Sequence, residues 1–567
     1  MPAADAARPW QAAYPPGIDW AAPLPDHPLG RLLDDAVQRF GERPCLDFLG
    51  RRYRFREIGG LVDRAAAGLQ RLGIGKGTRV GLFLPNTPYY VVCYFAVLKI
   101  GGIVVNFNPL YVEREVHHLV ADAGVETMVT LDLELLYPTV ARMLGSTGLK
   151  RIVVCRMADI LPYPKNWLFR LFKRSETAAI PADERHIPFA DLIANDGKPE
   201  PVEIDPANDV AVLQYTGGTT GVPKGAMLTH RNLVANAAQC RIWFQGVGKG
   251  NERALGVLPF FHAFAMTSAM NFSVATGNEI IMVPRFELRE LLATIAKKRP
   301  TIFPGVPTLF TAINNHKDIA AYDLSSVKFC ISGGAPLPLE VKTAFEALTG
   351  ATLVEGYGLS EASPVVVCNP FGALNKPGSV GLPLPGTMVE ILSLEEPGRL
   401  MKTGQRGEVC VRGPQVMQGY WGKPEETARV LDGGRLHTGD VGYLDEDGYL
   451  FLVDRIKDII IGSGYKIYPR NVEEAIYQNP AVAECIVLGL PDPYRGQTVK
   501  AYIVVAAGHE LSEAALTSFL ADKLSPIEMP KQIEFRASLP KTTIGKLSKQ
   551  ALLAEEAARA AAKSPSA

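Results

Sequence analysis

The sequence predicts an α/β protein with a large N-terminal domain, made of α/β subdomains and a β-rich subdomain, and a small C-terminal α+β domain. At 567 residues the chain is too long for one hydrophobic core. Short apolar runs alternate with helix-like segments, which is typical of largely parallel sheets covered by helices. From about residue 378 the pattern changes to short strands separated by glycine and proline, which indicates a compact β subdomain.

The alternating elements can be placed in order along the chain. Residues 79–84 form a short apolar run that predicts a buried strand, and residues 89–99 predict a helix. A helix is also expected to begin at His230, after a glycine-rich loop. Further strands of the α/β region are expected at residues 103–105, 126–130, 151–154, 210–213 and 328–332.

The C-terminal part of the chain is expected to form a separate, smaller unit. A charged segment at residues 454–458 marks its boundary, and residues 470–478 predict a helix. Residues 483–488 and 500–505 predict strands, and the alanine-rich end predicts a frayed helix and a disordered tail. The predicted divisions are a large domain over residues 1–453, the boundary over 454–458, a small domain over 459–554 and the tail over 555–567.

The composition argues against several classes of protein. Lysine plus arginine equals aspartate plus glutamate at 59 each, so nothing indicates a nucleic-acid partner. The eight cysteines include no CxxC pair, which favours reduced thiols of a cytoplasmic protein over disulfides or a zinc site. The N-terminal residues do not resemble a secretory signal. The longest apolar stretch, residues 89–106, contains Lys99 and two glycines and is not expected to span a membrane.

Residues 215–226, with the sequence YTGGTTGVPKGA, read as a loop that holds phosphate. Four glycines allow the backbone to present N–H groups to an anion, three threonines add hydroxyl donors, and Lys224 adds a positive charge. The common P-loop has glycine before its lysine and serine or threonine after it, whereas Lys224 lies between Pro223 and Gly225. The segment therefore predicts a phosphate loop of another kind, and the alternative is a flexible surface hairpin.

Four more polar segments follow in a fixed order. Residues 355–361 place Tyr357 between two glycines and end in a carboxylate, and residues 437–440 place Asp440 at a tight turn. Residues 454–458 are densely charged, and residues 540–546 end in Lys546. Each alone is compatible with an ordinary turn, a helix cap or a solvated lysine. Their combination is hard to explain by chance.

In this order the segments resemble the core motifs of the adenylate-forming enzymes, which include acyl-CoA synthetases, beetle luciferases and peptide-synthetase adenylation domains. The resemblance extends from about Leu29 to about Leu553. It is strongest to bacterial long-chain fatty-acid–CoA ligases, on residues 215–232, 258–265, 413–421 and 436–442. It implies that a carboxylic acid attacks the α-phosphate of Mg²⁺-ATP to form an acyl adenylate, and that the thiol of coenzyme A then takes the acyl group.

The resemblance also implies roles for individual residues. Asp440 would bind the ribose with the help of Arg455, and Tyr357 would lie against the adenine. Glu361 and Thr216 would hold Mg²⁺. The expected catalytic residues are Lys546, His262, Thr216 and Lys224. The loop expected around the β- and γ-phosphates comprises Thr216, Gly217, Gly218, Thr219, Thr220 and Lys224, and the rest of the nucleotide pocket comprises Gly334, Ala335, Glu355, Gly356, Gly358 and Ser360.

The small domain is expected to move between the two half-reactions. Lys457 matches the hinge position of the family. Rotation there would withdraw Lys546, which neutralises charge during adenylation, and would bring Gly462 and Gly464 to the site to receive coenzyme A. His262 would border the acyl carboxylate, although a histidine beside aromatic residues is often a core residue.

Two departures from the family pattern stand out. Ser360 replaces a more usual threonine and keeps the hydroxyl group. Shortly after the histidine, some long-chain members have a tryptophan that closes the acyl tunnel, whereas this chain has Phe264-Ala265-Met266. This difference weakens a prediction of the acyl chain length. The apolar residues expected to line the acyl site are Phe264, Met266, Met270, Phe272 and residues 364–367.

This apolar lining favours medium- to long-chain fatty acids. The alternatives are an aryl- or dicarboxylate-CoA ligase, a ligase that loads a carrier protein, or a catalytically silent protein that binds acyl groups or nucleotides. Residues 163–174 mix aromatic and basic side chains, which indicates either peripheral contact with the inner face of a membrane or a segment folded onto the large domain. The segment ending at Lys546 also resembles a target of lysine acetyltransferases. The oligomeric state stays open, and a homodimer is compatible with the sequence.

Overall fold

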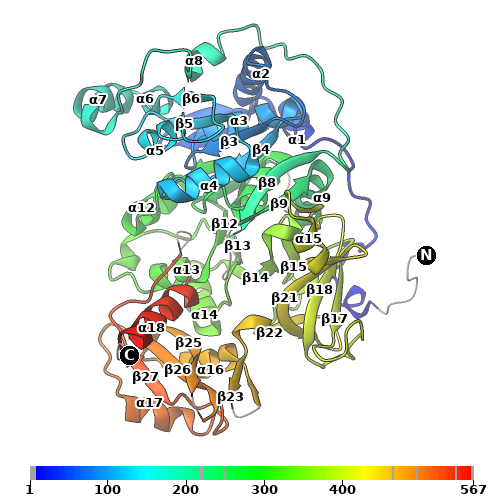
Figure 1. Ribbon diagram of the computed structural model, residues 1–567, viewed down its shortest axis with the longest axis vertical. Helices are drawn as coiled ribbons and strands as arrows, with labels where there is room; N and C mark the ends of the chain where they lie inside the picture. The colour runs from blue at the N-terminus through cyan, green and yellow to red at the C-terminus, as the bar shows by residue number, and fades with distance from the viewer. Residues whose placement is uncertain are drawn as a thin grey trace.

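The structure of the protein is a computed structural model that describes residues 8–216, 223–246, 250–462, 465–492, 494–542 and 546–563. These residues form four sheets with helices packed around them (Figure 1). Two large sheets and an antiparallel sheet belong to the large domain, and the fourth sheet belongs to the small domain at the lower end of Figure 1. The predicted α/β class, with a β-rich subdomain and an α+β C-terminal domain, is confirmed.

The two large sheets have parallel central strands and antiparallel edges. Strands such as β3 and β4 are buried along most of their length, as expected for strands covered on both faces. The first sheet has the order β16 (Leu382–Pro383), β15 (Val365–Cys368), β14 (Thr352–Gly358), β13 (Phe329–Ser332), β12 (Ile302–Gly305), β10 (Arg253–Gly256), β11 (Glu279–Met282), β1 (Pro44–Phe48) and β2 (Arg51–Arg54). The second has the order β19 (Gly419–Tyr420), β9 (Lys224–Thr229), β8 (Val210–Thr216), β4 (Ile103–Asn106), β3 (Arg79–Phe83), β5 (Thr127–Leu131), β6 (Arg151–Cys155) and β7 (His186–Pro188).

The helices of the large domain cover and connect these sheets. Helix α3 is apolar on all sides and is buried from Pro88 to Leu98, which is the expected position for a helix without a polar face. The helices are α1 (Arg31–Phe40), α2 (Phe55–Arg71), α3 (Pro88–Lys99), α4 (Glu113–Ala123), α5 (Tyr137–Ala141), α6 (Met157–Ile160), α7 (Lys165–Phe172), α8 (Phe189–Leu192), α9 (His230–Trp243), α10 (Ala263–Ala265), α11 (Phe272–Thr276), α12 (Leu288–Lys298), α13 (Pro307–Asn314), α14 (Leu339–Thr349) and α15 (Pro424–Val430).

The antiparallel sheet and the small domain follow along the chain. The antiparallel sheet contains β17 (Met388–Leu392), β18 (Gly407–Arg412), β21 (Arg435–Leu444), β20 (Leu431–Asp432) and β22 (Leu450–Arg455). The small domain contains β23 (Ile460–Gly462), β24 (Tyr465–Ile467), β25 (Val482–Asp492), β26 (Gly496–Val505), β27 (Gln532–Phe535) and helices α16 (Pro469–Tyr477), α17 (Glu513–Leu520) and α18 (Lys549–Lys563). It has an apolar core of its own that includes Val472, Ile476 and Ile503. A short helical turn, η6 (Ile456–Asp458), connects β22 to β23.

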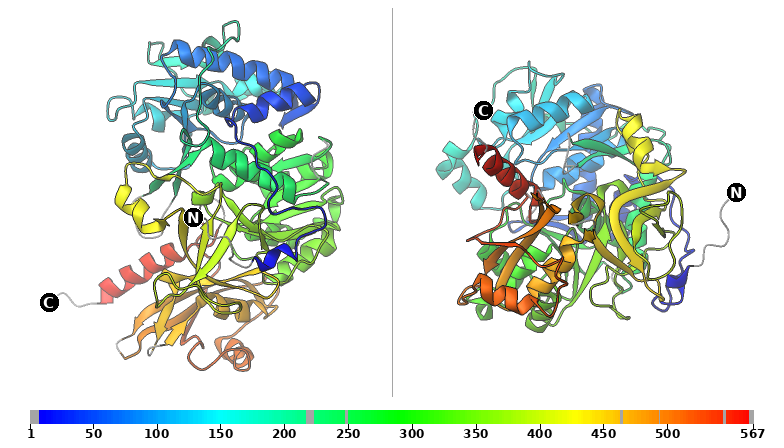
Figure 2. Two further views of the ribbon diagram at one scale, coloured as in Figure 1. Left: turned by 90° about the vertical axis from the view of Figure 1, so that its right-hand side faces the viewer. Right: turned by 60° about the horizontal axis from the view of Figure 1, so that its bottom comes forward.

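Two elements differ from the prediction. The strand β9 lies between the phosphate loop and α9, where no strand was predicted, and it pairs antiparallel with β8 so that Thr216 faces Lys224. The tail predicted from residue 555 is helical up to Lys563, because α18 is rich in alanine and ion pairs hold it to the small domain (Figure 2). These pairs join Arg559 to Glu534 at 2.9 Å and Glu556 to Lys500 at 3.0 Å. Residues 564–567 lie outside the described part.

Two expectations about the whole chain can be compared with the structure. All eight cysteines are buried and free of disulfide bonds. Among the described residues, no helix combines the length and the apolar character needed to cross a bilayer.

Candidate active site

Three of the predicted nucleotide-binding residues meet where the first sheet approaches the antiparallel sheet. The Tyr357 hydroxyl donates a hydrogen bond to Oδ2 of Asp440 at 2.6 Å, and the Arg455 Nε lies 3.1 Å from Oδ1. Asp440 and Arg455 are cross-strand partners on β21 and β22. Burial raises the pKa of Asp440, while the Arg455 guanidinium opposes that shift. The trio therefore offers a carboxylate held between a phenol and a cation, which is suited to accept hydrogen bonds from a diol.

The local sequence fixes this geometry. Residues 437–440, expected at a tight turn, lie instead within β21. Thr438 Oγ1 donates to the Val409 carbonyl at 2.6 Å and accepts the Asp440 N–H at 3.1 Å, so the part of β21 before Asp440 is held to β18. On the other side, Gly358 has no room for a side chain, because a Cβ there would lie 1.9 Å from the Pro364 carbonyl oxygen. The glycine of this motif therefore permits the close approach of two backbone segments.

Lys546 reaches from the small domain into the large one. Its side chain lies against Gly334, so close that a Cβ on residue 334 would be 2.4 Å from Lys546 Cε and 2.6 Å from Nζ. Gly334 has a φ of +81° in the loop after β13. Burial, aided by the nearby charge of Arg455, lowers the pKa of Lys546 to about 8. Burial, aided by the charge of Lys546, lowers the pKa of His262 to about 3.

Lys224 and Glu361, predicted for the phosphates and Mg²⁺, are connected through Tyr420. The Lys224 Nζ pairs with the carboxylate of Glu426 on α15 and lies 5.2 Å from the centre of the Tyr420 ring. The Tyr420 hydroxyl donates to Glu361 Oε1 at 2.9 Å. Thr216 lies at the end of β8, with its hydroxyl 3.5 Å from the Lys224 carbonyl oxygen.

No role was predicted for Tyr420 or Glu426. Tyr420 lies in residues 413–421, which resemble a motif of the family, whereas no sequence pattern around Glu426 indicates a functional residue. The remaining phosphate-loop residues of the prediction, Gly217, Gly218, Thr219 and Thr220, lie outside the described residues.

The other residues predicted for the nucleotide pocket lie on β14 and in the segments next to it. Glu355 is buried on β14, and its Oε1 accepts the Leu337 N–H at 3.1 Å, so its side chain supports the loop that contains Gly334 and Ala335. Burial raises the pKa of Glu355 to about 7. Gly356 and Gly358 continue β14, and Ser360 begins the short turn η5 (Ser360–Ala362) that carries Glu361.

The residues predicted for the hinge and for coenzyme A binding lie on the small-domain side. Lys457 lies in η6, where burial and the charge of Arg455 lower its pKa. Gly462 ends β23 and is the cross-strand partner of Tyr465 and Gly496 within the small domain's own sheet. Gly464 lies outside the described residues. Lys546 is the small-domain residue beside Gly334, and this is the arrangement expected for the first half-reaction.

The predicted acyl lining follows His262. The His262 ring accepts the Phe264 N–H at 3.4 Å and caps a helix that includes the π-helical turn η3 (Met266–Asn271). Such turns are often found at functional sites. Met266, Met270 and Phe272 are buried, as is β15, and Phe264 is partly buried with its ring 3.1 Å from the Cβ position of Gly333.

A buried polar network that the sequence did not reveal supports the loop before His262. The Asn86 side chain donates to two carbonyls of residues 256–258 and accepts the Phe260 N–H at 2.8 Å. The Tyr90 hydroxyl donates to the Phe260 carbonyl at 2.9 Å, and Gln214 Nε2 donates to the Phe261 carbonyl at 3.0 Å. Hydrogen bonds from Asn86, Tyr90 and Gln214 therefore fix the loop that precedes His262.

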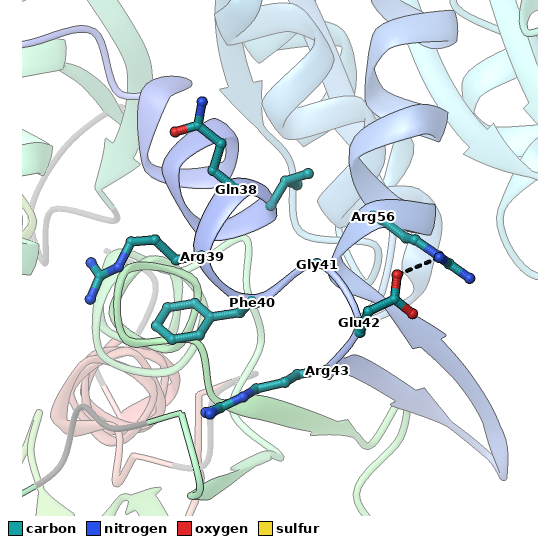
Figure 3. Close-up of a pocket in the computed structure, with 8 residues that line it drawn as sticks. Gln38, Arg39, Phe40, Gly41, Glu42, Arg43 and Arg56 are labelled. Carbon is teal, nitrogen blue, oxygen red and sulfur yellow. Dashed lines mark hydrogen bonds and ion pairs between the residues drawn. The ribbon is translucent and has the colours of Figure 1, made fainter.

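A surface hollow at the end of α1 contains none of the predicted site residues (Figure 3). The guanidinium groups of Arg39 and Arg43 lie 5.0 and 5.3 Å from the centre of the Phe40 ring. The ion pair of Glu42 with Arg56 lines its other side. The candidate active site is therefore the region around Lys546, Gly334 and Asp440, and not this hollow.

The fold and the site define a two-domain α/β protein in which Lys546 of the small domain lies against Gly334 of the large domain. Two family models match the chain: AMP-binding enzyme over residues 33–421 and AMP-binding enzyme C-terminal domain over residues 471–546. The chain therefore belongs to the AMP-binding enzyme family, and the resemblance stated from its motifs is confirmed.

Curated relatives match along nearly the whole chain. A long-chain-fatty-acid–CoA ligase of Bacillus subtilis is 46% identical over 97% of this chain and 98% of its own length. A protein of the same description from Escherichia coli O157:H7 is 36% identical over 92% and 93%. The 4-coumarate–CoA ligase 2 of Oryza sativa subsp. japonica is 34% identical over 96% and 94%.

Solved structures share the fold. The anthranilate CoA ligase AuaEII in complex with anthranoyl-AMP has a TM-score of 0.83 at 26% identity, covering 95% of this chain and 98% of that one. ATP-bound MatB from Rhodopseudomonas palustris has a TM-score of 0.80 at 27% identity, covering 92% and 98%.

Proposed function

We propose that the protein is an AMP-forming ligase that activates a medium- to long-chain fatty acid with ATP and transfers the acyl group to coenzyme A. The observation that carries this proposal is the position of Lys546, from the small domain, against Gly334 of the large domain, together with the interacting group of Tyr357, Asp440 and Arg455. The relatives described as long-chain-fatty-acid–CoA ligases support the same substrate class.

In the first half-reaction the protein must bring two anions together. Asp440 and Arg455 would hold the ribose, and Lys224 would leave Glu426 to bind the outer phosphates. The Lys546 ammonium would then lie between the acyl carboxylate and the α-phosphate, where it lowers the repulsion between them and stabilises the charge of the transition state. His262, neutral because of its lowered pKa, would border the acyl carboxylate without adding charge.

The residues also fit a magnesium ion. Glu361 offers carboxylate oxygens, the donors that Mg²⁺ prefers, and Tyr420 links it to Lys224. Glu361 and Thr216 would hold the ion, which when bound neutralises part of the negative charge of the phosphates. In the second half-reaction, rotation at Lys457 would withdraw Lys546 and bring Gly462 and Gly464 towards coenzyme A.

A panel of acids tests the substrate class. We expect formation of acyl-CoA and AMP to be fastest with longer members of a series of saturated acids from about two to about eighteen carbons, because the predicted lining is apolar. Benzoate, coumarate and pimelate are the comparison acids. A preference for coumarate or benzoate would favour an aryl-CoA ligase, the second candidate that the relative from rice supports. Pyrophosphate release before coenzyme A is added would separate either enzyme from a silent binding protein.

We also propose that α7 docks on the inner face of an anionic membrane. None of its residues is buried, and Trp167 and Phe172 are 58% and 70% exposed, whereas Phe169 packs against the large domain. Lysine or arginine occupies positions 165, 170, 173 and 174, and two of these residues, Arg170 and Lys173, pair with Asp159 and Glu176. An exposed aromatic and basic helix suits a lipid interface, where fatty acids also partition. The helix projects from one edge of the large domain in Figure 1.

Binding to vesicles tests this docking surface. Replacing Trp167 and Phe172 together by serine should weaken binding to vesicles of phosphatidylglycerol and phosphatidylethanolamine by roughly 10-fold or more, since each buries apolar area in the interface. Tyr494→Ser, at a side chain that is 91% exposed in the small domain, is the matched control. Sedimentation with the vesicles measures the effect, and equal binding of both variants and the parent protein would reject the proposal.

A lysine acetyltransferase acting on Lys546 would switch off the first half-reaction. Acetylation removes the positive charge that the proposed mechanism requires. Because the amine lies against Gly334, modification would also require the small domain to move away first. We expect acetylated protein to release no pyrophosphate from ATP and fatty acid while still converting a supplied acyl adenylate to acyl-CoA. Unchanged pyrophosphate release would rule out this form of regulation.

A further inference from the structure

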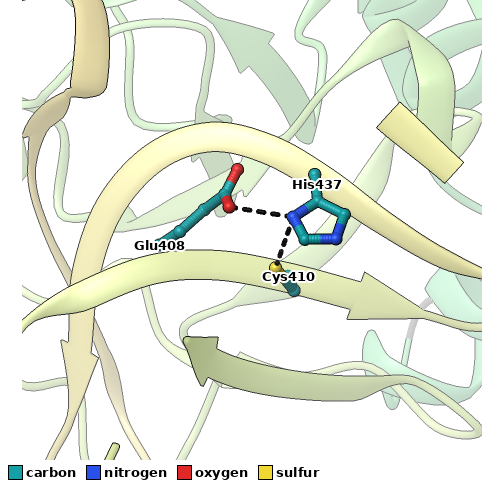
Figure 4. Close-up of side chains that lie close together, drawn as sticks. All are labelled: Glu408, Cys410 and His437. Atoms are coloured by element: carbon teal, nitrogen blue, oxygen red, sulfur yellow. Dashed lines mark hydrogen bonds and ion pairs between the residues drawn. The ribbon is translucent and has the colours of Figure 1, made fainter. Parts of the chain in front are cut away.

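Three side chains with metal-binding atoms gather on β18 and β21 of the antiparallel sheet, and β21 also carries Asp440 (Figure 4). Glu408 and Cys410 lie on β18, and His437 lies on β21. Cys410 and His437 are direct cross-strand partners, and Glu408 is two residues before Cys410, across an irregularity in the pairing of β18 with β21. The three side chains point toward one another (Figure 4). Their potential ligand atoms all lie within 4.8 Å of one another.

The distances are near those of a tetrahedral metal site. His437 Nδ1 lies 3.5 Å from Cys410 Sγ and 2.8 Å from Glu408 Oε2. Around a zinc ion with bonds of about 2.0–2.3 Å, neighbouring donors are separated by roughly 3.3–3.7 Å. The sulfur and the imidazole nitrogen already have this separation, and the carboxylate needs to move by only about 0.5–1 Å.

Burial and charge also suit a cation. Cys410 is fully buried, whereas the side chains of Glu408 and His437 are 17% and 28% exposed, so the group is open on one side. Three protein ligands with a fourth position open to water are common for zinc. A thiolate and a carboxylate balance two positive charges. The neighbouring guanidinium groups of Arg435 and Arg412 are bound to Glu390, at 2.7 and 3.4 Å, and not to Glu408.

We propose that Glu408, Cys410 and His437 form a site for a thiophilic divalent cation such as Zn²⁺, distinct from the Mg²⁺ expected at the phosphates. On binding, the Cys410 S–H bond breaks, its proton passes to water, and the sulfur bonds to the metal without any change of oxidation state. A thiolate ligand selects Zn²⁺ or Co²⁺ over Mg²⁺ and Ca²⁺. Glu408 Oε1 also accepts the Gly439 N–H at 3.2 Å, which connects the site to the residue before Asp440.

Titration with Co²⁺ tests the site without relying on ligase activity. Full-length protein without a histidine tag should bind one equivalent, with the thiolate charge-transfer band and the visible bands of tetrahedral cobalt, and Zn²⁺ should displace it. Cys410→Ala should lose the charge-transfer band, and Glu408→Gln should weaken binding by at least about 10-fold.

Cys330→Ala is the matched control, because Cys330 is also a fully buried thiol but lies on β13. The Cys330→Ala variant should keep the thiolate charge-transfer band. If Cys410→Ala folds poorly, Zn²⁺ should raise the Tm of the parent protein and of Cys330→Ala but not that of Glu408→Gln. Absence of the charge-transfer band in the parent protein, or its persistence in Cys410→Ala, would overturn the proposal.

Discussion

Replacing Lys546 by alanine is expected to slow acyl-adenylate formation by roughly 10²–10³-fold, the range found when one preorganised charge-stabilising group is removed from an active site. The physical reason is that the attacking carboxylate and the α-phosphate are both anions, and Lys546 is the cation that the small domain brings against Gly334. Pyrophosphate release measured before coenzyme A is added reports this step. The same variant should convert a supplied acyl adenylate to acyl-CoA at close to the parent rate.

Lys541→Ala provides the matched control, since Lys541 belongs to the same segment but pairs with Glu484 in the small domain. It should leave pyrophosphate release almost unchanged. Equal losses in the two variants would indicate a general disturbance of the segment, and equal losses in both half-reactions would contradict the assigned role of Lys546.

The lowered pKa of Lys546 predicts how this step depends on pH. Lysine is cationic below its pKa and neutral above it, so kcat/KM for adenylation should fall as the pH rises through about 8. A lysine in water would keep its charge to about pH 10. The His262 imidazole, with a pKa of about 3, is neutral throughout and should add no inflection between pH 5 and pH 8. A flat profile up to pH 10 would contradict this prediction.

Gly334→Ala should slow adenylation by roughly 10–100-fold, because displacing a catalytic group by about 1 Å has effects of this size. The added methyl carbon would lie 2.4 Å from Lys546 Cε, so the lysine must leave its position. The left-handed backbone at Gly334 would add a stability cost of about 1–2 kcal/mol. Pyrophosphate release measures the rate, and thermal unfolding measures the stability.

Gly350→Ala separates these two effects. Gly350 has a similar φ of +72°, but nothing lies within 4 Å of its Cβ position, so the variant should share the stability cost and keep the activity. Combining Gly334→Ala with Lys546→Ala should cause no further loss beyond Lys546→Ala alone, because both remove the same interaction. An additive loss in the double variant would show that Gly334 acts on something other than this lysine.

Much of the fold follows from local patterns in the sequence. The strands β3 to β6 and the helix α3 were predicted to within a few residues, because buried parallel strands and an apolar helix leave continuous apolar runs. Strand β9 was missed. Its sequence, KGAMLT, carries no strong strand signal, and the strand forms because β8 and β19 pair with it on both sides. Tertiary pairing of this kind outweighs local propensity.

Some residues of the candidate site could be predicted from the sequence, whereas others could not. Tyr357, Asp440 and Lys546 each lie in a short segment of unusual composition, and the order of these segments identified the family. Tyr420 and Glu426 were missed because their partners, Glu361 and Lys224, are 59 and 202 residues away in the sequence. The absence of a CxxC pair argued against a zinc site, whereas the site proposed at Glu408, Cys410 and His437 is assembled from two neighbouring strands and leaves no such spacing in the sequence.

The ion pair between Lys224 and Glu426 has a consequence for ligand choice. Before ATP arrives, the lysine expected to bind phosphate already has a negatively charged partner that is part of the protein. An incoming anion must compete with a carboxylate held at close range, which disfavours chloride and other weakly charged ions much more than a polyphosphate. If Lys224 binds the outer phosphates as proposed, Glu426 would raise the charge that a ligand needs to occupy this position, without having to contact ATP itself.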